Sequence, residues 1–491
     1  MVEVSHLDVS YGNNDVLKDV SFVVREGEFV LISGPSGCGK STLALTLTGL
    51  VPHAVKARMK GVVRINGIDT RTSSVTELSS HIGIVFQNTQ SQLFHSTVAD
   101  EVSFAPRNGK LSPEEVVRRT EFAIAGTGIS SLRDRKLVEL SEGERHRVAI
   151  ASILSMKPKI LILDEPTANL DWRGVELLME TLSRLNRELG ITVLVIEHRL
   201  SAVYPYCSKA LVMKEGEIVS YGPKETVFAD RSRLVRLGLR FPWRWVERGP
   251  ERYVPEGVFP PRKEGEPVVE LENVSARYTK RAVLHGIDLS IYPGEFVAIV
   301  GNNGAGKSTL ARVMAGLHPL KSGRVRWHRD VKRLPLGRRV GFVFQGTGEQ
   351  LLCGCVREEI GLGPTSFGLD SEACTEMAME MTDLLALEHR SPHTLSVGEK
   401  QRCVLASVLA ADPVLFILDE PTVGQDWAHL SRVMSYLQKL QKMGKAVLII
   451  THDDKLVCRF AERIVSLEEG RIMADGIPVK RAGEQSMRAA F

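Results

Sequence analysis

The 491-residue sequence has no uninterrupted apolar run near the length of about 18 residues that a membrane-spanning helix needs. Its start, MVEVSHLDVS, lacks the basic and apolar segments of a secretory signal peptide. The seven cysteines are odd in number and irregularly spaced, which favours reduced thiols over a disulfide framework. The net charge of +4 is too small to indicate a nucleic-acid partner. These absences predict a cytosolic protein that neither crosses a membrane itself nor binds nucleic acid.

The two halves of the sequence repeat each other, motif by motif and in the same order. GPSGCGKST at residues 34–42 returns as GNNGAGKST at 301–309, and LSEGE at 140–144 returns as LSVGE at 395–399. The segments ILILDEPTANLDW and TVLVIEH return as LFILDEPTVGQDW and AVLIITH. A repeat this long indicates a duplicated domain, because solenoid units are only about 20–50 residues long.

A linker is predicted between the two halves. The stretch FPWRWVERGPERYVPEGVFPPRKEGEP is rich in Pro, Gly and charged residues, a composition that does not sustain a helix or a central strand. Its aromatic residues suit docking onto a neighbouring domain better than contact with a nucleic acid or a membrane surface. The predicted organisation is a first domain (1–240), a linker (241–267) and a second domain (268–491).

Each half is predicted to have an α/β fold. Runs such as KILILDE and ITVLVIEH are apolar at almost every position, which suits strands that are buried on both faces. Such strands are typical of a parallel sheet covered by helices. Predicted helices alternate with these runs along the chain, as an α/β fold requires.

The two glycine-rich stretches match the pattern G-x-x-x-x-G-K-[ST] of a phosphate-binding loop, and each follows a predicted strand and opens a predicted helix. Lys40 and Lys307 are expected to reach the β- and γ-phosphates, while Ser41 and Ser308 hold Mg²⁺. The backbone N–H groups and the helix N-terminus would bind the anion. The predicted ATP-binding residues are Gly34, Ser36, Gly37, Cys38, Gly39, Lys40, Ser41 and Thr42 in the first half, and Gly301, Asn303, Gly304, Ala305, Gly306, Lys307, Ser308 and Thr309 in the second.

Cys38 is also expected to be chemically reactive. A thiol next to Lys40 and among N–H groups that bind anions should have a lowered pKa and enhanced reactivity toward maleimide. The second half has Ala305 at this position.

An acidic pair ends the same apolar run in each half. Asp164 and Asp419 are predicted to direct a carboxylate at the Mg²⁺. The next residues, Glu165 and Glu420, are predicted to polarise the attacking water as general bases. A solvated turn is the alternative, but it would not follow a buried strand twice.

Three further residue types recur at equivalent places in both halves. A histidine ends the next buried strand and is expected to contact the γ-phosphate. A glutamine follows IVF or FVF and is expected to bind Mg²⁺ or to orient water. A tyrosine upstream of each loop has a flat face that could stack on adenine, with simple packing as the alternative. These residues are His198 and His452, Gln87 and Gln345, and Tyr11 and Tyr278.

The order of these motifs resembles the ATP-binding cassette superfamily over nearly the whole chain. The resemblance implies two tandem P-loop NTPase domains, each with a mainly parallel sheet, an antiparallel β subdomain and a helical subdomain that carries the LS-x-GE signature. It also implies that the two cassettes of one chain sandwich two ATP molecules head to tail, with Mg²⁺. Each signature would then cap the ATP held by the other half, through Ser141 and Gly143 or through Ser396 and Gly398. Serines that open helices are chemically suited to that contact.

The signatures depart from the family pattern. Glu142 and Val397 stand at a glycine position, and Glu144 and Glu399 stand at a glutamine position. An added carboxylate near a γ-phosphate is expected to weaken closure of the sandwich. Both halves keep the glutamate and the histidine, so neither ATP site is expected to be degenerate.

The segments FQNTQSQLFHSTVADEVSFAP and FQGTGEQLLCGCVREEIGLGP are similar to the ATPases of energy-coupling factor importers, although Cys353 and Gly354 depart from that pattern. This resemblance implies a peripheral protein at the cytoplasmic face of the cell membrane. Its partners would be an energy-coupling transmembrane protein and a substrate-binding membrane component for a vitamin, a vitamin precursor or a transition-metal ion. The alternative is a soluble twin-cassette ATPase of translation or ribosome recycling. A DNA-repair cassette is disfavoured, because no long insertion separates the loop from the signature.

Overall fold

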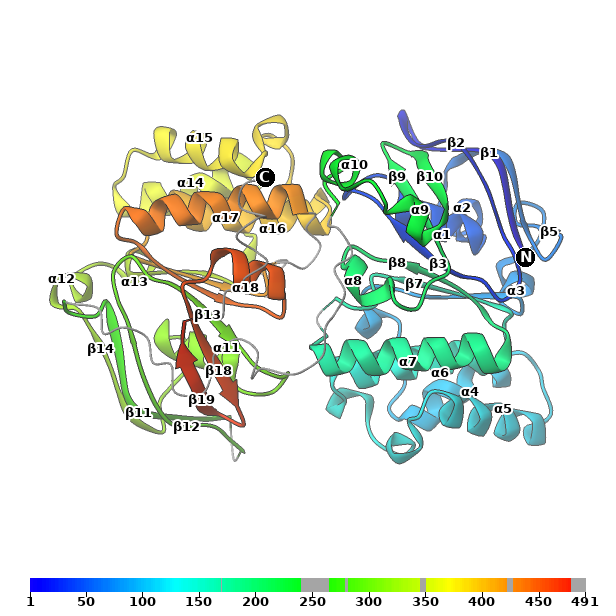
Figure 1. Cartoon of the computed structure of the whole chain (residues 1–491), viewed down its shortest axis with the longest axis horizontal. Coiled ribbons are helices and arrows are strands. Elements are labelled where there is room, and N and C mark those ends of the chain that lie inside the picture. Colours follow the sequence, from blue (N-terminus) through cyan, green and yellow to red (C-terminus); the bar gives the residue numbers. More distant parts are fainter. Residues whose placement is uncertain (169, 240–264, 279–280, 345–349, 422–426, 478–491) are drawn as a thin grey trace. The chain divides into compact units, whose positions relative to one another are not determined.

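The structure is a computed structural model of the chain. It describes all residues except 169, 240–264, 279–280, 345–349, 422–426 and 478–491. The chain divides into two compact units, residues 1–245 and 246–491 (Figure 1). Most of the predicted linker lies outside the described residues, so its limits and its aromatic side chains remain predictions.

The central layer of the first unit is a six-stranded sheet in the order β10-β9-β3-β8-β7-β6. All of its strands run parallel except β10, which pairs antiparallel with β9. The strands are β3 (Phe29–Ser33), β6 (Ile82–Val85), β7 (Ile160–Asp164), β8 (Thr192–Ile196), β9 (Lys209–Lys214) and β10 (Glu217–Pro223). The apolar runs of the sequence therefore form a mainly parallel sheet, as predicted.

Successive side chains of these strands enter two separate cores, one on each face of the sheet. In β3, Phe29 and Leu31 join the core beneath the helices, while Val30 and Ile32 join the core beneath an outer antiparallel sheet. Burial on both faces explains why the strands are apolar at consecutive positions.

The outer sheet of the first unit has the order β2-β1-β4-β5, and its strands pair antiparallel. Leu17, Val20 and Phe22 of β2 are buried, while the residues between them are more exposed, as expected for a sheet with one covered face. The strands are β1 (Val2–Tyr11), β2 (Asn14–Val24), β4 (Arg58–Ile65) and β5 (Ile68–Asp69).

Helices complete the layers of the first unit. Helices α4, α5 and α6 contact one another, α7 contacts α6 and β8, and α1 contacts β4 and β7. Their bounds are α1 (Lys40–Leu47), α2 (Leu50–His53), α3 (Val75–Leu78), α4 (Val98–Asn108), α5 (Pro113–Gly126), α6 (Glu142–Leu154), α7 (Trp172–Leu189), α8 (Leu200–Val203), α9 (Lys224–Val227) and α10 (Arg231–Arg236).

Local chemistry sets where the longer helices begin and end. The side chains of Thr97, Ser112 and Asp171 accept N–H groups in the first turns of α4, α5 and α7. Gly190 ends α7 in the left-handed conformation, with φ of 67°. No helix in the described part of the chain is both long and apolar enough to cross a bilayer.

The second unit repeats this architecture, which confirms the predicted pair of α/β cassettes. Its central sheet has the order β15-β16-β17-β13-β18-β19, with only β19 antiparallel, and its outer antiparallel sheet has the order β12-β11-β14. The strands are β11 (Val269–Tyr278), β12 (Arg281–Ile291), β13 (Phe296–Val300), β14 (Ser322–Trp327), β15 (Val340–Val343), β16 (Leu415–Asp419), β17 (Ala446–Ile450), β18 (Arg463–Glu468) and β19 (Arg471–Gly476). The helices are α11 (Lys307–Met314), α12 (Arg329–Lys332), α13 (Leu336–Arg339), α14 (Val356–Phe367), α15 (Ser371–Thr382), α16 (Val397–Ala410), α17 (Trp427–Lys442) and α18 (Asp454–Phe460).

Candidate functional site

Each phosphate-binding loop is a tight connection between a central strand and a helix, β3 to α1 in the first unit and β13 to α11 in the second. Gly39 and Gly306 directly precede the helices and both have φ of 100°, in the left-handed region. A Cβ atom on Gly39 would lie 2.7 Å from Leu17 Cδ2 and 2.9 Å from Val16 O. Glycine is therefore required for both conformation and space.

The two lysines fold back over their own loops. Lys40 Nζ donates to Gly34 O at 2.9 Å and to Pro35 O at 2.8 Å, and Lys307 Nζ makes the equivalent contacts in the second unit. Both lysines are buried, which concentrates positive charge within each loop. The other predicted residues of the two loops lie beside them or in the first turns of α1 and α11: Ser36, Gly37, Thr42, Asn303, Gly304, Ala305 and Thr309.

The expectation for Cys38 is wrong. Its side chain is buried beneath the loop, and this burial raises the pKa of the Cys38 thiol more than the nearby Lys40 lowers it. Sγ lies 3.8 Å from Lys40 Nζ. The thiol belongs to the apolar core that includes Leu43, and its raised pKa disfavours the reactive thiolate although backbone N–H groups of the loop act in the opposite direction.

A buried carboxylate faces the first helical turn of each unit. Burial raises the pKa of Asp164 to about 6, against a hydrogen bond with Ser41 that lowers it. Burial also raises the pKa of Asp419, which hydrogen-bonds Ser308. Oδ1 of each aspartate is buried and has no hydrogen-bond partner among the described residues. A buried, unsatisfied carboxylate oxygen beside a serine hydroxyl is a donor set that fits Mg²⁺.

Glu165 lies between two polar side chains from other elements. Gln87 Nε2 donates to Glu165 Oε2 at 3.0 Å, and His198 Nε2 lies 3.0 Å from Glu165 Oε1. Burial favours the neutral carboxyl, but the hydrogen bond and charge of His198, together with Lys40, lower the pKa of Glu165 below its ordinary value. Its φ of 48° is in the left-handed region, an uncommon conformation for a residue with a Cβ. The structure thus brings together three residues predicted from separate motifs.

The second unit has the same arrangement in its described part. Glu420 has φ of 52° and its Oε1 lies 3.3 Å from His452 Nε2. The same His452 nitrogen lies 3.1 Å from Asn303 Oδ1 in the phosphate-binding loop. Gln345 lies outside the described residues, so its contact remains a prediction.

The glutamates that end the two signatures have a structural role. Ser141 Oγ accepts the N–H of Glu144 at 3.3 Å, and the Glu144 carboxylate accepts the N–H of Ser141 at 2.7 Å. Ser396 and Glu399 form the same capping box, at 3.3 Å and 2.8 Å. Each carboxylate therefore points back to its own helix start and completes the cap there, and its effect on closure of the sandwich remains a prediction. Gly143 and Gly398 follow in the first turns of α6 and α16.

The two predicted adenine-stacking tyrosines have different surroundings. Tyr11, at the end of β1, packs against the core beneath the outer sheet. Tyr278 is exposed, its ring centroid lies 4.4 Å from that of His318, and its hydroxyl accepts from Arg312 at 3.3 Å. Stacking on adenine remains a prediction for both.

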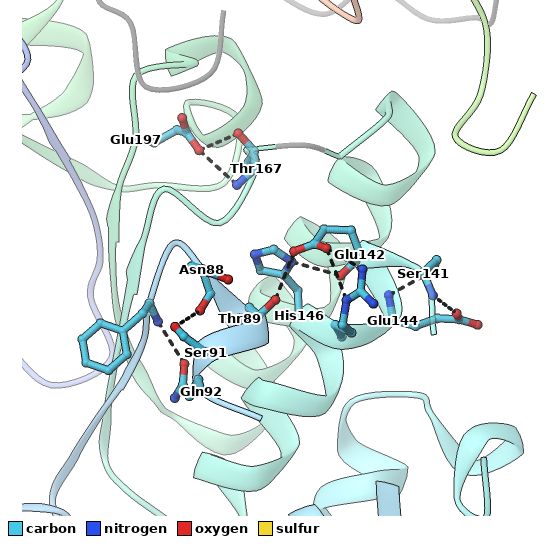
Figure 2. Close-up of polar contacts among 12 residues, drawn as sticks. Asn88, Thr89, Ser91, Gln92, Ser141, Glu142, Glu144, His146, Thr167 and Glu197 are labelled. Carbon is cyan, nitrogen blue, oxygen red and sulfur yellow. Dashed lines mark hydrogen bonds and ion pairs between the residues drawn. The ribbon is translucent and has the colours of Figure 1, made fainter. Parts of the chain in front are cut away.

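One buried carboxylate near His198 was not predicted from the sequence. Glu197 Oε2 accepts the Thr167 hydroxyl at 2.5 Å (Figure 2), and Glu197 Oε1 accepts the N–H groups of His198 and Arg199 at 2.8 and 2.9 Å. It therefore fixes the turn that presents His198 to Glu165. The signal in the sequence is a charged residue at the end of an otherwise apolar strand, where the second half has Thr451.

This combination of loops, acidic pairs and histidines in two α/β units defines a twin-cassette nucleotide-binding protein. A family model described as ABC transporter matches residues 17–168 and 284–423. The chain belongs to the ABC transporter ATPase family, whose cassettes imply ATP hydrolysis.

Several relatives and solved structures match nearly the whole chain. A protein of Methanosarcina mazei named "Putative ABC transporter ATP-binding protein" is 35% identical and aligns with 97% of this chain and 89% of its own. A structure of archaeal ribosome recycling factor aABCE1 with ribosomal stalk protein aP1 is 22% identical, with a TM-score of 0.64 and coverage of 99% of this chain and 92% of that chain. The structure titled RNase-L Inhibitor is 23% identical, with a TM-score of 0.63 and the same coverage. At this identity the two structures show a shared fold.

Proposed function

We propose that the chain is the ATPase subunit of a membrane importer of the energy-coupling factor type, whose membrane-spanning parts are separate proteins. Its cargo would be a vitamin, a vitamin precursor or a transition-metal ion, and the chain would bind peripherally at the cytoplasmic face. The name carried by full-length relatives and the sequence that follows Gln87 and Gln345 support this proposal.

The observation that carries the proposal is an exposed apolar side chain held at the same place on each unit. Phe94 is 65% exposed and Leu352 is 76% exposed. The N–H of Phe94 donates to buried Glu101 at 3.0 Å, and that of Leu352 donates to buried Glu359 at 2.7 Å. A buried carboxylate thus fixes the backbone while the apolar side chain remains in water. This arrangement, which occurs in both units, is suited to the docking of an apolar segment from a partner protein.

The first unit enlarges this surface with further aromatic rings. Phe104 of α4 packs edge to face on Phe94 with ring centroids 4.9 Å apart, and His95 lies 4.5 Å from Phe94. Only a short segment separates these residues from Gln87, which contacts Glu165. A shift of Gln87 upon ATP binding or hydrolysis would therefore reach the docking surface directly.

The residues of each site have distinct roles in the proposed reaction. Lys40 exchanges its loop carbonyls for phosphate oxygens, which neutralises part of the negative charge of ATP. Ser41 and Asp164 would hold Mg²⁺, which would supply further neutralisation of the phosphate charge. Lys307, together with the serine and aspartate of the second unit, does the same for the second ATP.

Glu165 is the proposed general base for hydrolysis in the first unit. Its lowered pKa keeps it anionic, so it can accept a proton from the attacking water. The water oxygen forms a bond to the γ-phosphorus as the bond to the β–γ bridging oxygen breaks. His198 and Gln87 hold the carboxylate from its two sides. Glu420 and His452 are proposed to do the same in the second unit.

The two cassettes are proposed to close head to tail around two ATP molecules. The hydroxyls of Ser141 and Ser396 accept within their capping boxes, so each can still donate its own proton to a γ-phosphate of the other unit. Hydrolysis removes that contact and allows reopening. Repeated closure and reopening would drive the membrane partner.

Affinity purification of the tagged full chain from native membranes tests this function. We expect the wild-type chain to recover a polytopic membrane protein. The double variant Phe94→Asp with Leu352→Asp should lose that partner and keep its basal ATP hydrolysis. A matched control, Val117→Asp with Met443→Asp, replaces side chains that are 61% and 78% exposed at other places and should retain the partner.

Two results would contradict the proposal. Equal recovery of the membrane protein by both double variants would exclude Phe94 and Leu352 from the docking surface. Stoichiometric ribosomal subunits without any membrane protein would instead support the translation-associated alternative.

A further inference from the structure

A polar cluster joins the segment after Gln87 to the signature helix α6 within the first unit (Figure 2). Thr89 is fully buried, and its hydroxyl donates to Glu142 Oε1 at 3.1 Å. Glu142 is the first residue of α6, directly after Ser141. The bond connects residues 53 positions apart and fastens the loop to the helix.

The carboxylate of Glu142 is itself held in place. Arg145, one turn further along α6, donates to Glu142 Oε2 from Nη2 at 2.8 Å and from Nε at 3.3 Å. Such charge-assisted bonds fix the plane of a carboxylate. His146 adds a contact of 3.0 Å between Nδ1 and the carbonyl of Glu142, which can only accept, so Nδ1 carries the hydrogen. Glu142 therefore has a defined orientation toward Thr89.

The loop that carries Thr89 is compact. Gln92 accepts the N–H of Phe86 at 3.1 Å and donates to Ile84 O at 3.0 Å, which fastens the loop to strand β6. The N–H of Leu93 donates to Thr89 O at 3.1 Å. In the second unit, Gln350 makes the same pair of bonds at 3.0 and 3.1 Å. Attachment of the loop to its strand is therefore common to both units.

The carboxylate that attaches the loop to the signature helix in the first unit is not repeated in the sequence of the second unit. The second unit has Val397 where the first has Glu142, and valine has no polar side-chain atom that could accept a hydroxyl. In the first unit, Gln87 lies two residues before Thr89 and donates to Glu165. The hydrogen bond between Thr89 and Glu142 therefore links the position of α6 to the contact between Gln87 and Glu165. The second unit cannot form the equivalent bond, because Val397 has no side-chain acceptor.

We propose that Glu142 is a positioning residue, which holds the loop that follows Gln87 in place through its hydrogen bond with Thr89. We call Glu142, Thr89 and Arg145 together the carboxylate clamp. The clamp makes the contact between Gln87 and Glu165 depend on the orientation of the signature helix in the first unit only. The Glu165 site is then coupled to the signature helix of its own unit, whereas the second unit has no carboxylate at the equivalent position, Val397, although both units keep their catalytic glutamates. The catalytic consequence rests on the role proposed for Glu165.

Hydrogen–deuterium exchange of the full-length chain tests the clamp directly. In Glu142→Val, which copies the second unit, and in Thr89→Val, amides of residues 86–94 should exchange about tenfold faster, because each variant removes a hydrogen bond to a charged group. The double variant should exchange no faster than either single variant, and Thr89→Ser should behave as wild type. The peptide covering 344–352 serves as an internal control and should not change.

A second control removes a carboxylate from the same helical layer. Glu121→Gln breaks an exposed ion pair with Arg133 and should leave exchange at 86–94 unchanged. Unchanged exchange in both Glu142→Val and Thr89→Val would overturn the clamp, and so would additive effects in the double variant.

ATP turnover tests the catalytic consequence. In a Glu420→Gln background, where the Glu165 site alone turns over, Thr89→Val should lower kcat about tenfold with little change in KM. An unchanged kcat would overturn the positioning role. Separately, undiminished hydrolysis in Glu165→Gln would refute the base assignment, and the exchange result would still decide whether the clamp exists.

Discussion

Asp164→Asn is expected to stabilise the first unit while abolishing its Mg²⁺-dependent activity. Burial raises the pKa of Asp164 from the ordinary 3.8 to about 6, although Ser41 and Lys40 act in the opposite direction. A difference of about two pKa units lowers the free energy of unfolding by about 3 kcal/mol at a pH where the carboxyl is ionised in both the folded and the unfolded state. Asparagine has nearly the same shape and no charge, so it removes this cost.

The sign of the pH dependence follows from the raised pKa. The folded protein binds the proton of Asp164 more tightly than the unfolded chain, so this residue's contribution to stability falls as pH rises from about 4 to about 6. Above that range the contribution is constant. The free energy of unfolding of the variant should therefore exceed that of the wild type by about 3 kcal/mol at pH 8 and by less at pH 5. For a unit of this size the gain raises the unfolding midpoint by about 6–12 °C.

Thermal unfolding at pH 5 and pH 8, without Mg²⁺ or nucleotide, checks this expectation. Addition of Mg²⁺ and ATP should raise the midpoint of the wild type more than that of the variant. Asp69→Asn is a matched control, because the hydrogen bond with Arg71 lowers the pKa of Asp69, so this substitution should not stabilise. Equal midpoints of wild type and Asp164→Asn at pH 8 would refute the claim that Asp164 carries an unsatisfied charge.

Three other expectations follow from the sites. Glu165→Gln combined with Glu420→Gln should retain ATP binding and lower phosphate release at least about 100-fold, because the general base is lost; undiminished release would exclude that role. Ser396→Arg, tested in a Glu420→Gln background, should lower the remaining turnover of the ATP held at Lys40, and normal turnover would contradict head-to-tail closure. Cys38→Ala should stay active, and mass spectrometry should find the wild-type thiol labelled slowly by maleimide with or without ATP; rapid labelling would contradict its burial.

Much of the fold could be predicted because the relevant patterns are local. A few neighbouring residues are enough to predict each local structure. This holds for the glycine-rich loop before Lys40, for the strand before Glu165 and for the strand before His198. Parallel pairing then brings the ends of β7 and β8 together, which places Glu165 beside His198. The predicted fold is confirmed, and the roles of Glu165 and His198 remain predictions.

Other features depend on residues distant in the sequence. The burial of Cys38 results from a core that includes Met213 and other residues of the central and outer sheets, so the neighbouring Lys40 was a misleading guide to its pKa. The bond between Thr89 and Glu142 also has no local signal. By contrast, Ser141 and Glu144 form the S-x-x-E pattern of a capping box, so the structural role of that glutamate was readable from the sequence.

The most direct test of the central claim counts ATP per chain and measures particle mass in the variant Glu165→Gln with Glu420→Gln. If the two phosphate-binding loops serve one closed pair of cassettes, each chain should trap two ATP molecules, remain a monomer and become more compact in solution scattering. A dimer of chains that forms only with ATP, or one ATP per chain without compaction, would contradict the account.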